Sequence, residues 1–449
     1  MSETSRHQLL VFTRYPEPGS AKTRLISALG EEGAAELHRR MTEHLVEQAR
    51  RLLAIHPVSI RICFERGDPQ RMRTWLGAEW DYALQGSGDL GRRMAEAFAS
   101  AFRDRAELAV LVGTDVPHLT APILYQAFRQ LEGGDLVLGP AEDGGYYLIG
   151  LERSVFERAA PRLFAGVAWG TDSVLDQTLA AADELDLRWS LTDRLADVDR
   201  PEDVQVWEDL QRAESVASQN GWISVIVPAL DEADGIGRTL ACIPKRDDLE
   251  VIVVDGGSAD GTPERARALG VRVIAGAPPR SRQMNLGAAA ARGAIYLFLH
   301  ADTLLPGDFA DCVRRASAMP SVAAGAFTLK IDSARPGIRA VERLANLRSR
   351  HLSLPYGDQA LFVTARLFWE LGGFPLIPIM EDFALVRRLA RRGRIAIIDR
   401  PALTAGRRWD RLGILRTTLI NQLIVLAYAL GVPPELLARW YRRSRRPRR

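Results

Sequence analysis

Cysteine is scarce in this sequence of 449 residues. Its three copies, Cys63, Cys242 and Cys312, are scattered, and no C-x-x-C pair has the spacing of a zinc or redox site. An apolar leader is also missing, since the chain opens with MSETSRHQ. These absences favour a reduced compartment, and we expect a cytoplasmic protein whose cysteines serve as small buried hydrophobes.

A large excess of one charge is missing as well. The formal net charge is +3, so we expect no nucleic-acid partner. The chain nevertheless ends in the basic segment WYRRSRRPRR, just after the apolar stretch LGILRTTLINQLIVLAYALGV. Arg416, Asn421 and Gln422 interrupt that stretch, which argues against a membrane-spanning helix. Two alternatives stay open: an amphipathic helix whose basic tail contacts the inner membrane face peripherally, or a helix packed on its own domain.

The sequence does contain a repeated alternation of strand-like and helix-like segments. Its length exceeds one ordinary core, and 47% hydrophobic with 26% charged residues is typical of globular domains. Apolar runs such as QLLVFTR and LAVLVGTD alternate with segments of helical apolar spacing, and the pattern restarts at WISVIVPAL. We predict two tandem α/β domains with mostly parallel sheets, residues 1–215 and 221–449, with the polar segment QRAESVASQNG as linker.

Two of the expected strands end in the same way. IYLFLHAD ends at Asp302 and LAVLVGTD ends at Asp115, and each lies before a proline and a helix-like segment. A lone Asp at such a place is often a helix cap. Two equivalent strand ends suggest instead two related units, with carboxylates that hold a divalent cation against a ligand's diphosphate.

An ordered set of motifs runs through the second half: PALDE, DGGSADGT, RSRQMNLGAAAARG, HAD, LPYGDQALFV, MEDFALVRRL and GRRW. Together they resemble the family 2 glycosyltransferases of the GT-A fold over nearly all of residues 222–410. The resemblance implies an inverting, metal-dependent transfer of a sugar from a nucleotide-sugar donor to an acceptor hydroxyl. The family's D-x-D motif is reduced here to H-A-D, so Asp302 is the expected ligand of Mg²⁺ or Mn²⁺. Asp231 stands where the family often has Asn, which leaves the base preference open.

The resemblance also implies roles for individual residues. Asp382, supported by Glu381, would take the proton of the acceptor hydroxyl. The alternative is that both acids complement the dipole of the helix that they open. The expected binding residues for the nucleotide-sugar donor are Pro228, Asp231, Glu232, Asp255, Gly257, Arg282, Gln283, Asn285, Asp358, Gln359, Arg408 and Trp409.

FTRYPEPGSAKTRL is the most informative stretch of the first half. Arg14, Lys22 and Arg24 surround a turn with Gly19 at a helix start, and such a turn can bind an anion through cations and backbone N–H groups. It is not a P-loop, because G-x-x-x-x-G-K-[ST] is absent. A solvated basic turn is the alternative.

With QGSGDLGRRM, VGTDVPHL, GPAEDGGYYLIG and LADVDRPEDV, this stretch resembles a GT-A-fold group close to the molybdenum-cofactor guanylyltransferases, over about residues 8–210. The resemblance implies that the three cations hold nucleotide phosphates and that Asp115 binds Mg²⁺ or Mn²⁺. Asp197 and Asp199 would lie on opposite faces of an expected strand, and Asp199 is preferred as the second metal ligand. The substrate pocket would be shaped by Asp143, Gly144, Gly145 and Tyr146.

The leading hypothesis is a bifunctional transferase that uses nucleotide-activated substrates. Its second half would transfer a sugar to an unknown acceptor, either a small molecule or a lipid-linked one. Its first half would be a second glycosyltransferase-like domain. Two alternatives for the first half are a nucleotidyltransferase that releases pyrophosphate from a nucleoside triphosphate, and a non-catalytic nucleotide-sensing domain.

Overall fold

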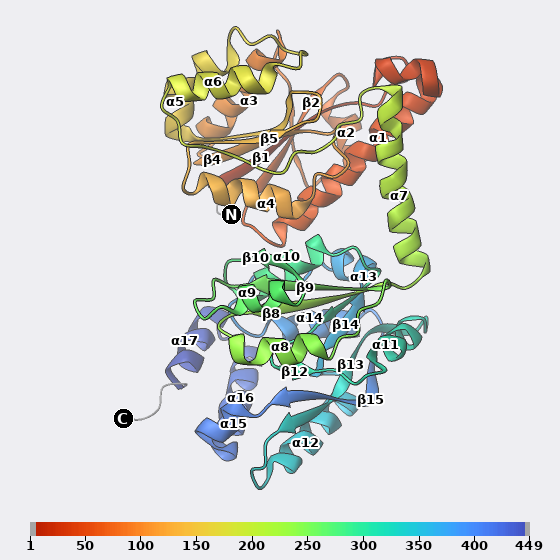
Figure 1. Cartoon of the computed structure of the whole chain (residues 1–449), viewed down its shortest axis with the longest axis vertical. Coiled ribbons are helices and arrows are strands. Elements are labelled where there is room, and N and C mark those ends of the chain that lie inside the picture. The colour runs from red at the N-terminus through yellow and green to blue at the C-terminus, as the bar shows by residue number, and fades with distance from the viewer. Residues whose placement is uncertain (1–5, 445–449) are drawn as a thin grey trace. The chain divides into compact units, whose positions relative to one another are not determined.

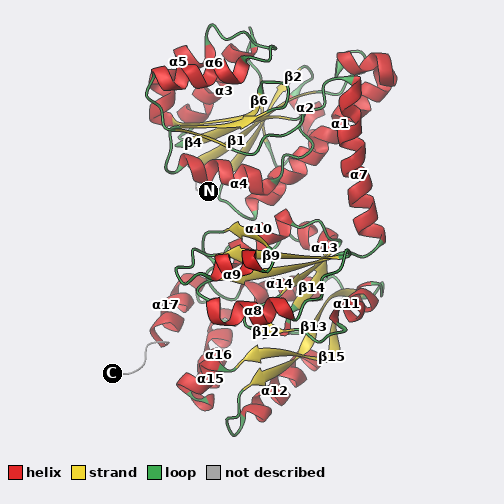
Figure 2. Cartoon of the chain, in the orientation of Figure 1, coloured by secondary structure: helices red, strands yellow, loops and turns green. Residues whose placement is uncertain are grey.

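The computed structural model describes residues 6–444 and divides the chain into two compact units, residues 1–213 and 214–449. In each unit, helices cover a mostly parallel sheet, as Figures 1 and 2 show. This arrangement confirms the predicted fold class of two tandem α/β domains. The segment predicted as a linker is helical up to Gln219, because it continues helix α7 (Val204–Gln219).

The first sheet has seven strands in the order β3-β2-β1-β4-β6-β5-β7. Strands β1 to β4 are parallel, β6 is antiparallel to both of its neighbours, and β5 is parallel to β7. The antiparallel strand β6 was not expected from the sequence. The strands are β1 (His7–Arg14), β2 (Ser59–Glu65), β3 (Asp81–Leu84), β4 (Leu108–Gly113), β5 (Leu136–Pro140), β6 (Tyr146–Glu152) and β7 (Trp189–Leu191).

Helices lie on both faces of this sheet, with α3, α5 and α6 on one face and α4 on the other (Figure 1). Apolar residues at helical spacing explain the packing of α3, since Met94, Phe98 and Phe102 are buried against sheet residues such as Leu10 and Leu111. The helices are α1 (Ile26–Leu53), α2 (Pro69–Leu76), α3 (Leu90–Arg103), α4 (Ala121–Leu131), α5 (Arg153–Phe164) and α6 (Val174–Glu184).

The second sheet has eight strands in the order β10-β9-β8-β11-β14-β13-β15-β12. Strands β8 to β11 are parallel, β14 is antiparallel to both neighbours, and β13 is parallel to β15. The strands are β8 (Ile223–Ala229), β9 (Leu249–Asp255), β10 (Arg272–Ala275), β11 (Ile295–Phe298), β12 (Thr303–Leu304), β13 (Val322–Asp332), β14 (Leu361–Thr364) and β15 (Arg394–Ala405).

The two sheets share one strand order and one pattern of directions when the short β12 is set aside. In this correspondence β8 matches β1, β11 matches β4 and β14 matches β6. Asp115 follows β4 and Asp302 follows β11, so the two carboxylates lie after equivalent strands. The structure therefore agrees with the hypothesis of two related units.

The second unit carries more helices after its sheet than the first. Among the described residues, none of its helices, nor any in the first unit, is both long and apolar enough to cross a membrane. Its helices are α8 (Ala233–Ala241), α9 (Thr262–Ala268), α10 (Arg280–Ala290), α11 (Phe309–Ser317), α12 (Ile338–Leu352), α13 (Ala365–Glu370), α14 (Glu381–Ala390), α15 (Arg407–Leu412), α16 (Ile414–Ala429) and α17 (Pro434–Ser444).

Candidate active sites

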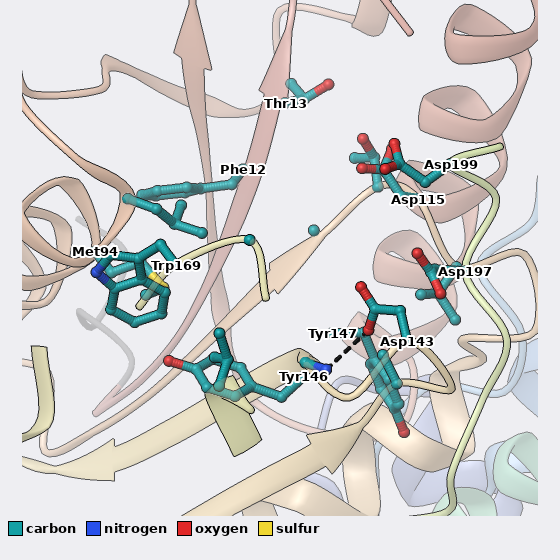
Figure 3. Close-up of a pocket in the computed structure, with 18 of the residues that line it drawn as sticks. Phe12, Thr13, Met94, Asp115, Asp143, Tyr146, Tyr147, Trp169, Asp197 and Asp199 are labelled. Carbon is teal, nitrogen blue, oxygen red and sulfur yellow. Dashed lines mark hydrogen bonds between the residues drawn. The ribbon is translucent and has the colours of Figure 1, made fainter. Parts of the chain in front are cut away.

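The first unit contains a cavity of about 470 Å³, lined by residues that follow β1 and β4. One side of this cavity is apolar and aromatic, with Phe12, Met94 and Trp169 (Figure 3). Figure 3 shows four carboxylates on the other side: Asp115, Asp143, Asp197 and Asp199. A pocket divided in this way suits a ligand with a flat ring at one end and a charged group at the other.

Lys22 neutralises two of these carboxylates. Its Nζ lies 2.8 Å from Asp115 Oδ1 and 3.8 Å from Asp199 Oδ1, and only 4% of its side chain is exposed. Desolvation alone would raise the pKa of Asp115, but the Lys22 ammonium and nearby His38 hold it below its ordinary value. The buried Lys22 ammonium therefore keeps Asp115 charged.

The other two predicted cations also have acidic partners. Arg24 forms an ion pair with Asp199, and Arg14 lies 3.3 Å from Glu65 while donating to the Ser20 carbonyl. All three cations line the cavity, whereas Gly19 does not. A bound phosphate would compete with these carboxylates for the cations, unless a metal ion neutralised the carboxylates.

The strand expected around Asp197 and Asp199 is absent, and that prediction is wrong. Strand β7 ends at Leu191, and the segment beyond it makes one isolated bridge at Leu195. Without strand alternation, both carboxylates line the same cavity. Desolvation, with the charge of Asp143 nearby, raises the pKa of Asp197 to about 6.

The D-G-G turn before β6 is shaped as its glycines require. Gly144 has a φ of +88°, and a Cβ there would lie 2.1 Å from the Asp172 carbonyl oxygen. The Gly145 N–H donates to Asp143 Oδ1 at 2.8 Å, the dashed bond in Figure 3. The turn holds the Asp143 carboxylate in the cavity and leads directly to Tyr146.

In the second unit, Asp302 shares a cation with Glu232. One Nη of Arg407 lies 3.0 Å from Asp302 Oδ2 and 2.6 Å from Glu232 Oε2. Two carboxylates thus again share one basic side chain, as Asp115 and Asp199 share Lys22. Because 56% of the Arg407 side chain is exposed, it can move aside for another cation.

A second cluster of polar groups converges on Gly357. A Cβ at this residue would lie 2.9 Å from His300 Nε2, 3.1 Å from Asp382 Oδ2 and 3.3 Å from Arg280 Nη2. The Gly357 N–H donates to Asp382 Oδ2 at 2.8 Å. Burial and Arg280 lower the pKa of His300 well below its ordinary value, so this ring is neutral. Three segments far apart in the sequence therefore meet at the carboxylate predicted to act as base.

Two further carboxyls beside Asp382 have raised pKa values. Desolvation, with the charge of Asp382, raises the pKa of Asp358 to about 6, although Arg348 and Arg280 oppose the shift. Desolvation and Asp382 likewise raise the pKa of Glu381. Perturbed carboxyls that share one place are typical of catalytic sites.

Asn285 and Gln359 correct the sequence interpretation, because both are fully buried. Asn285 exchanges two hydrogen bonds with the backbone of Phe374, at 2.8 and 2.9 Å. Gln359 donates to the Phe327 carbonyl and accepts from Ser349. These side chains brace the backbone around the site.

The predicted base-binding loops are tied to each other. Asp255 accepts hydrogen bonds from the backbone N–H groups of Gly257 and Ser258 and from the Ser258 hydroxyl. Asp231 accepts from Ala259 N, while its own N–H donates to Ser258 Oγ. The loops after β8 and β9 are thus joined before any ligand binds.

The remaining predicted residues lie in different surroundings. Pro228 lines a small cavity together with Arg280, His300 and Asp382. Gln283 is buried against Gly256, and Arg282 donates to the Pro278 carbonyl.

The basic-aromatic motif GRRW requires a second correction. Trp409 packs in an apolar cluster with Leu329, Ile331 and Ile338, because the short helix α15 turns the indole toward β13. The side chain of Arg408 lies outside the described residues. Arg407 is therefore the cation of this motif that the structure brings to Asp302.

Sequence reasoning also missed Arg280 and Trp169 as pocket residues. Arg280 opens the motif RSRQMNLGAAAARG, which does not indicate which of its side chains face inward, and Trp169 lies in none of the motifs given above. Tertiary structure decides where each side chain points. The packing of α10 against β8 does so for Arg280, and the course of the loop before α6 does so for Trp169.

Two family models match the chain, one in each unit. Residues 48–171 match a family described as "Uncharacterized protein conserved in bacteria (DUF2064)", and residues 224–368 match "Glycosyl transferase family 2". No guanylyltransferase model is among these matches, so that resemblance of the first half stays a prediction.

Individual relatives are similar over parts of the chain. A glucosyl-3-phosphoglycerate synthase from Mycolicibacterium paratuberculosis is 40% identical over 96 residues, which is 19% of this chain and 29% of that protein. The chain thus spans less than a third of the curated relative that it matches.

Solved structures are also similar. A candidate nucleotide-diphospho-sugar transferase from Desulfovibrio desulfuricans G20 is 34% identical and covers 44% of this chain and 84% of its own, with a TM-score of 0.40. The glucosyl-3-phosphoglycerate synthase of Mycobacterium tuberculosis, solved with Mn²⁺ and UDP-glucose, is 23% identical, covers 50% of this chain and 84% of its own, and has a TM-score of 0.37.

The Lys22 bridge generates a first prediction. Lys22→Ala deprives Asp115 of the ammonium 2.8 Å away, so we expect the full chain to lose about 1–3 kcal/mol of unfolding free energy. Mn²⁺ should restore part of this loss, because a divalent cation can replace the ammonium between the acids. Urea unfolding with and without MnCl₂ measures both effects. Lys245→Ala, at an exposed lysine, is the control, and an equal loss in both variants would contradict the bridge.

The raised pKa of Asp358 generates a second prediction. Its folded value of about 6 lies above its ordinary 3.8, so the folded state gains stability from the proton at low pH and loses it as pH rises through 6. Asp358→Asn should therefore be more stable than the wild type by about 2 kcal/mol at pH 7 and equal to it near pH 4. Thermal unfolding across this range measures the difference. The exposed Asp399→Asn should show no such trend, and a wild-type advantage at pH 7 would rule the shift out.

Proposed function

Since residues 224–368 carry a family 2 glycosyltransferase domain and residues 48–171 a DUF2064 domain, we propose that the chain is a bifunctional transferase of nucleotide-activated substrates. The domain of residues 221–449 transfers a sugar, with inversion, from a nucleotide sugar to an acceptor hydroxyl. The domain of residues 1–215 acts on a second nucleotide-activated substrate. The observation that carries the proposal is the convergence of His300, Arg280 and Asp382 on Gly357. His300 lies only two residues before Asp302 in the chain.

In the second unit, Asp382 accepts the proton of the acceptor hydroxyl while the hydroxyl oxygen forms a bond to the anomeric carbon of the donor. The bond between that carbon and the diphosphate breaks, and its electron pair stays on the diphosphate oxygen. Asp382 is the best-placed base because the N–H groups of Gly357 and Phe383 hold its carboxylate beside His300 and Arg280. Arg407 can pair with the leaving diphosphate.

A divalent cation, Mg²⁺ or Mn²⁺, fits beside Asp302. Asp302 and Glu232 already share the positive charge of the half-exposed Arg407 side chain, and a metal ion can supply the same charge to these two carboxylates. Within residues 6–444 no group of three His, Cys, Asp or Glu side chains is arranged to hold a metal, so donor phosphates and water would complete the coordination. When bound, the ion neutralises charge on the diphosphate. In the first unit, Asp115 and Asp199 would hold the ion.

The cavity of the first unit supports a second catalytic site. Its aromatic side can stack a nucleotide base, and its cations lie where phosphates would follow. We favour a glycosyltransferase-like activity. The resemblance to guanylyltransferases keeps the nucleotidyltransferase alternative open. A nucleotidyltransferase would differ from a glycosyltransferase by releasing pyrophosphate from a nucleoside triphosphate. A non-catalytic sensing domain would bind nucleotide and release no product.

Ligand-induced stabilisation of the full chain tests these assignments. We expect at least one of UDP-, GDP-, dTDP- and CDP-glucose to raise the melting temperature with Mn²⁺ and not with chelator. At a ligand concentration near 100 times Kd, the gain in unfolding free energy is about 2.7 kcal/mol. Asp302→Ala should abolish the response of the second unit, and Asp115→Ala that of the first. Asp399→Ala is the exposed control. If both site variants kept every response, the assignment of the two metal sites would fail.

Asp382→Asn tests the base directly. The amide cannot accept the proton, so we expect kcat to fall by about 10²–10⁴-fold while the donor Kd stays unchanged. Product formation is followed by release of the nucleoside diphosphate, with donor binding measured by calorimetry. Asp247→Asn, at an exposed carboxylate of the same unit, should match the wild type. A kcat within a few-fold of the wild type in Asp382→Asn would remove Asp382 from the mechanism.

A further inference from the structure

Helix α16 exposes a stripe of leucines. At 100° per residue, the five side chains fall within an arc of about 80°, and they extend over about 22 Å of helix. Their exposed fractions range from 54% to 87%. We call this stripe the leucine face, and its members are Leu415, Leu419, Leu423, Leu426 and Leu430. Soluble surfaces rarely gather apolar side chains in this way without a partner.

The opposite side of α16 is held by its own unit. Ile424 is buried in a cluster with Met380 and Phe383, and Tyr428 meets the Phe383 ring edge-on at 5.8 Å. These contacts fix the rotation of the helix, so the leucine face points away from the unit. They also connect α16 to the start of α14, where Asp382 lies.

The same end of the chain concentrates positive charge. Residues 411–449 contain nine arginines and one glutamate, a net charge of +8 in a chain whose total is +3. The rest of the chain is therefore net negative by five charges. Helix α17, which packs on α16, also exposes 51% of Trp440, and tryptophan favours the boundary between lipid and water.

We propose that the leucine face, together with the positive charge of residues 411–449, binds the surface of an anionic lipid bilayer, with α16 lying in the interfacial plane. Apolar side chains beside a strong positive charge supply the two attractions that such binding requires. The 16 residues of α16 extend about 24 Å, less than the roughly 30 Å of a bilayer core, so the helix lies on the membrane.

A second copy of the chain fits this face less well. A two-fold dimer would place each leucine face against the other and bring two segments of charge +8 together. An anionic bilayer neutralises this charge. The inference does not depend on the proposed activity, and it places the helix that carries Asp382 one helix layer from the lipid.

Vesicle co-sedimentation of the full chain tests the proposal. The probes are vesicles of phosphatidylcholine alone and of equal parts phosphatidylcholine and phosphatidylglycerol. We expect binding to the anionic vesicles only, weakened by salt. Leu415→Ser/Leu419→Ser/Leu426→Ser should lower partitioning by about tenfold or more, since each leucine loses its burial in lipid. Leu84→Ser, an equally exposed leucine of the first unit, should bind like the wild type.

A charge variant keeps the test independent of the leucines. Arg439→Glu/Arg442→Glu should also weaken binding, at unchanged melting temperature. Equal sedimentation with both vesicle types, or wild-type binding by the triple serine variant, would overturn the proposal. So would a dimer in gel filtration that the triple variant turns into a monomer, because a second copy would then cover the face.

Discussion

Two carboxylates that share one basic side chain occupy the same place in each unit, and the candidate sites depend on this interaction. Carboxylates brought together repel each other, and desolvation adds to the cost unless a cation lies between them. Lys22 meets this need for Asp115 and Asp199, and Arg407 meets it for Asp302 and Glu232. The basic group comes from the loop after the first strand in one unit and from the segment after the last parallel strand in the other. In both units two carboxylates share one cation, but the cation and the second carboxylate have exchanged strand ends.

The shared strand order explains why these loops can meet. The parallel strands β1 and β4, like β8 and β11, are direct neighbours, so their C-terminal ends deliver the groups to one edge. The antiparallel strands β6 and β14 then bring a turn back to that edge: the D-G-G turn in the first unit and the Gly357 turn in the second. Buried amides such as Asn285 stiffen the surrounding backbone, which lets the carboxylates hold raised or lowered pKa values without moving apart.

Helix α16 links this chemistry to the surface. Its inner side packs against the residues that flank Asp382, while its outer side is apolar and exposed. A single helix that packs beside Asp382 on one side and contacts lipid on the other would bring the site close to acceptors that reside in a membrane. Binding there would also cover apolar area that water otherwise solvates unfavourably.

The fold class and the two strand-end carboxylates follow from local sequence. Apolar runs form buried strands, and Asp302 and Asp115 end those runs whatever surrounds them, because strand formation depends on near neighbours. Only the tertiary structure decided the rest. Burial placed Asn285 and Gln359 inside, packing turned Trp409 into the core, and the lack of a strand brought Asp197 and Asp199 to one cavity. Lys22 and Arg407 pair with carboxylates that are far away in the chain, and the largest separation, between Lys22 and Asp199, is 177 residues. No local pattern encodes such a contact, since it arises when the sheet brings distant strand ends to one edge.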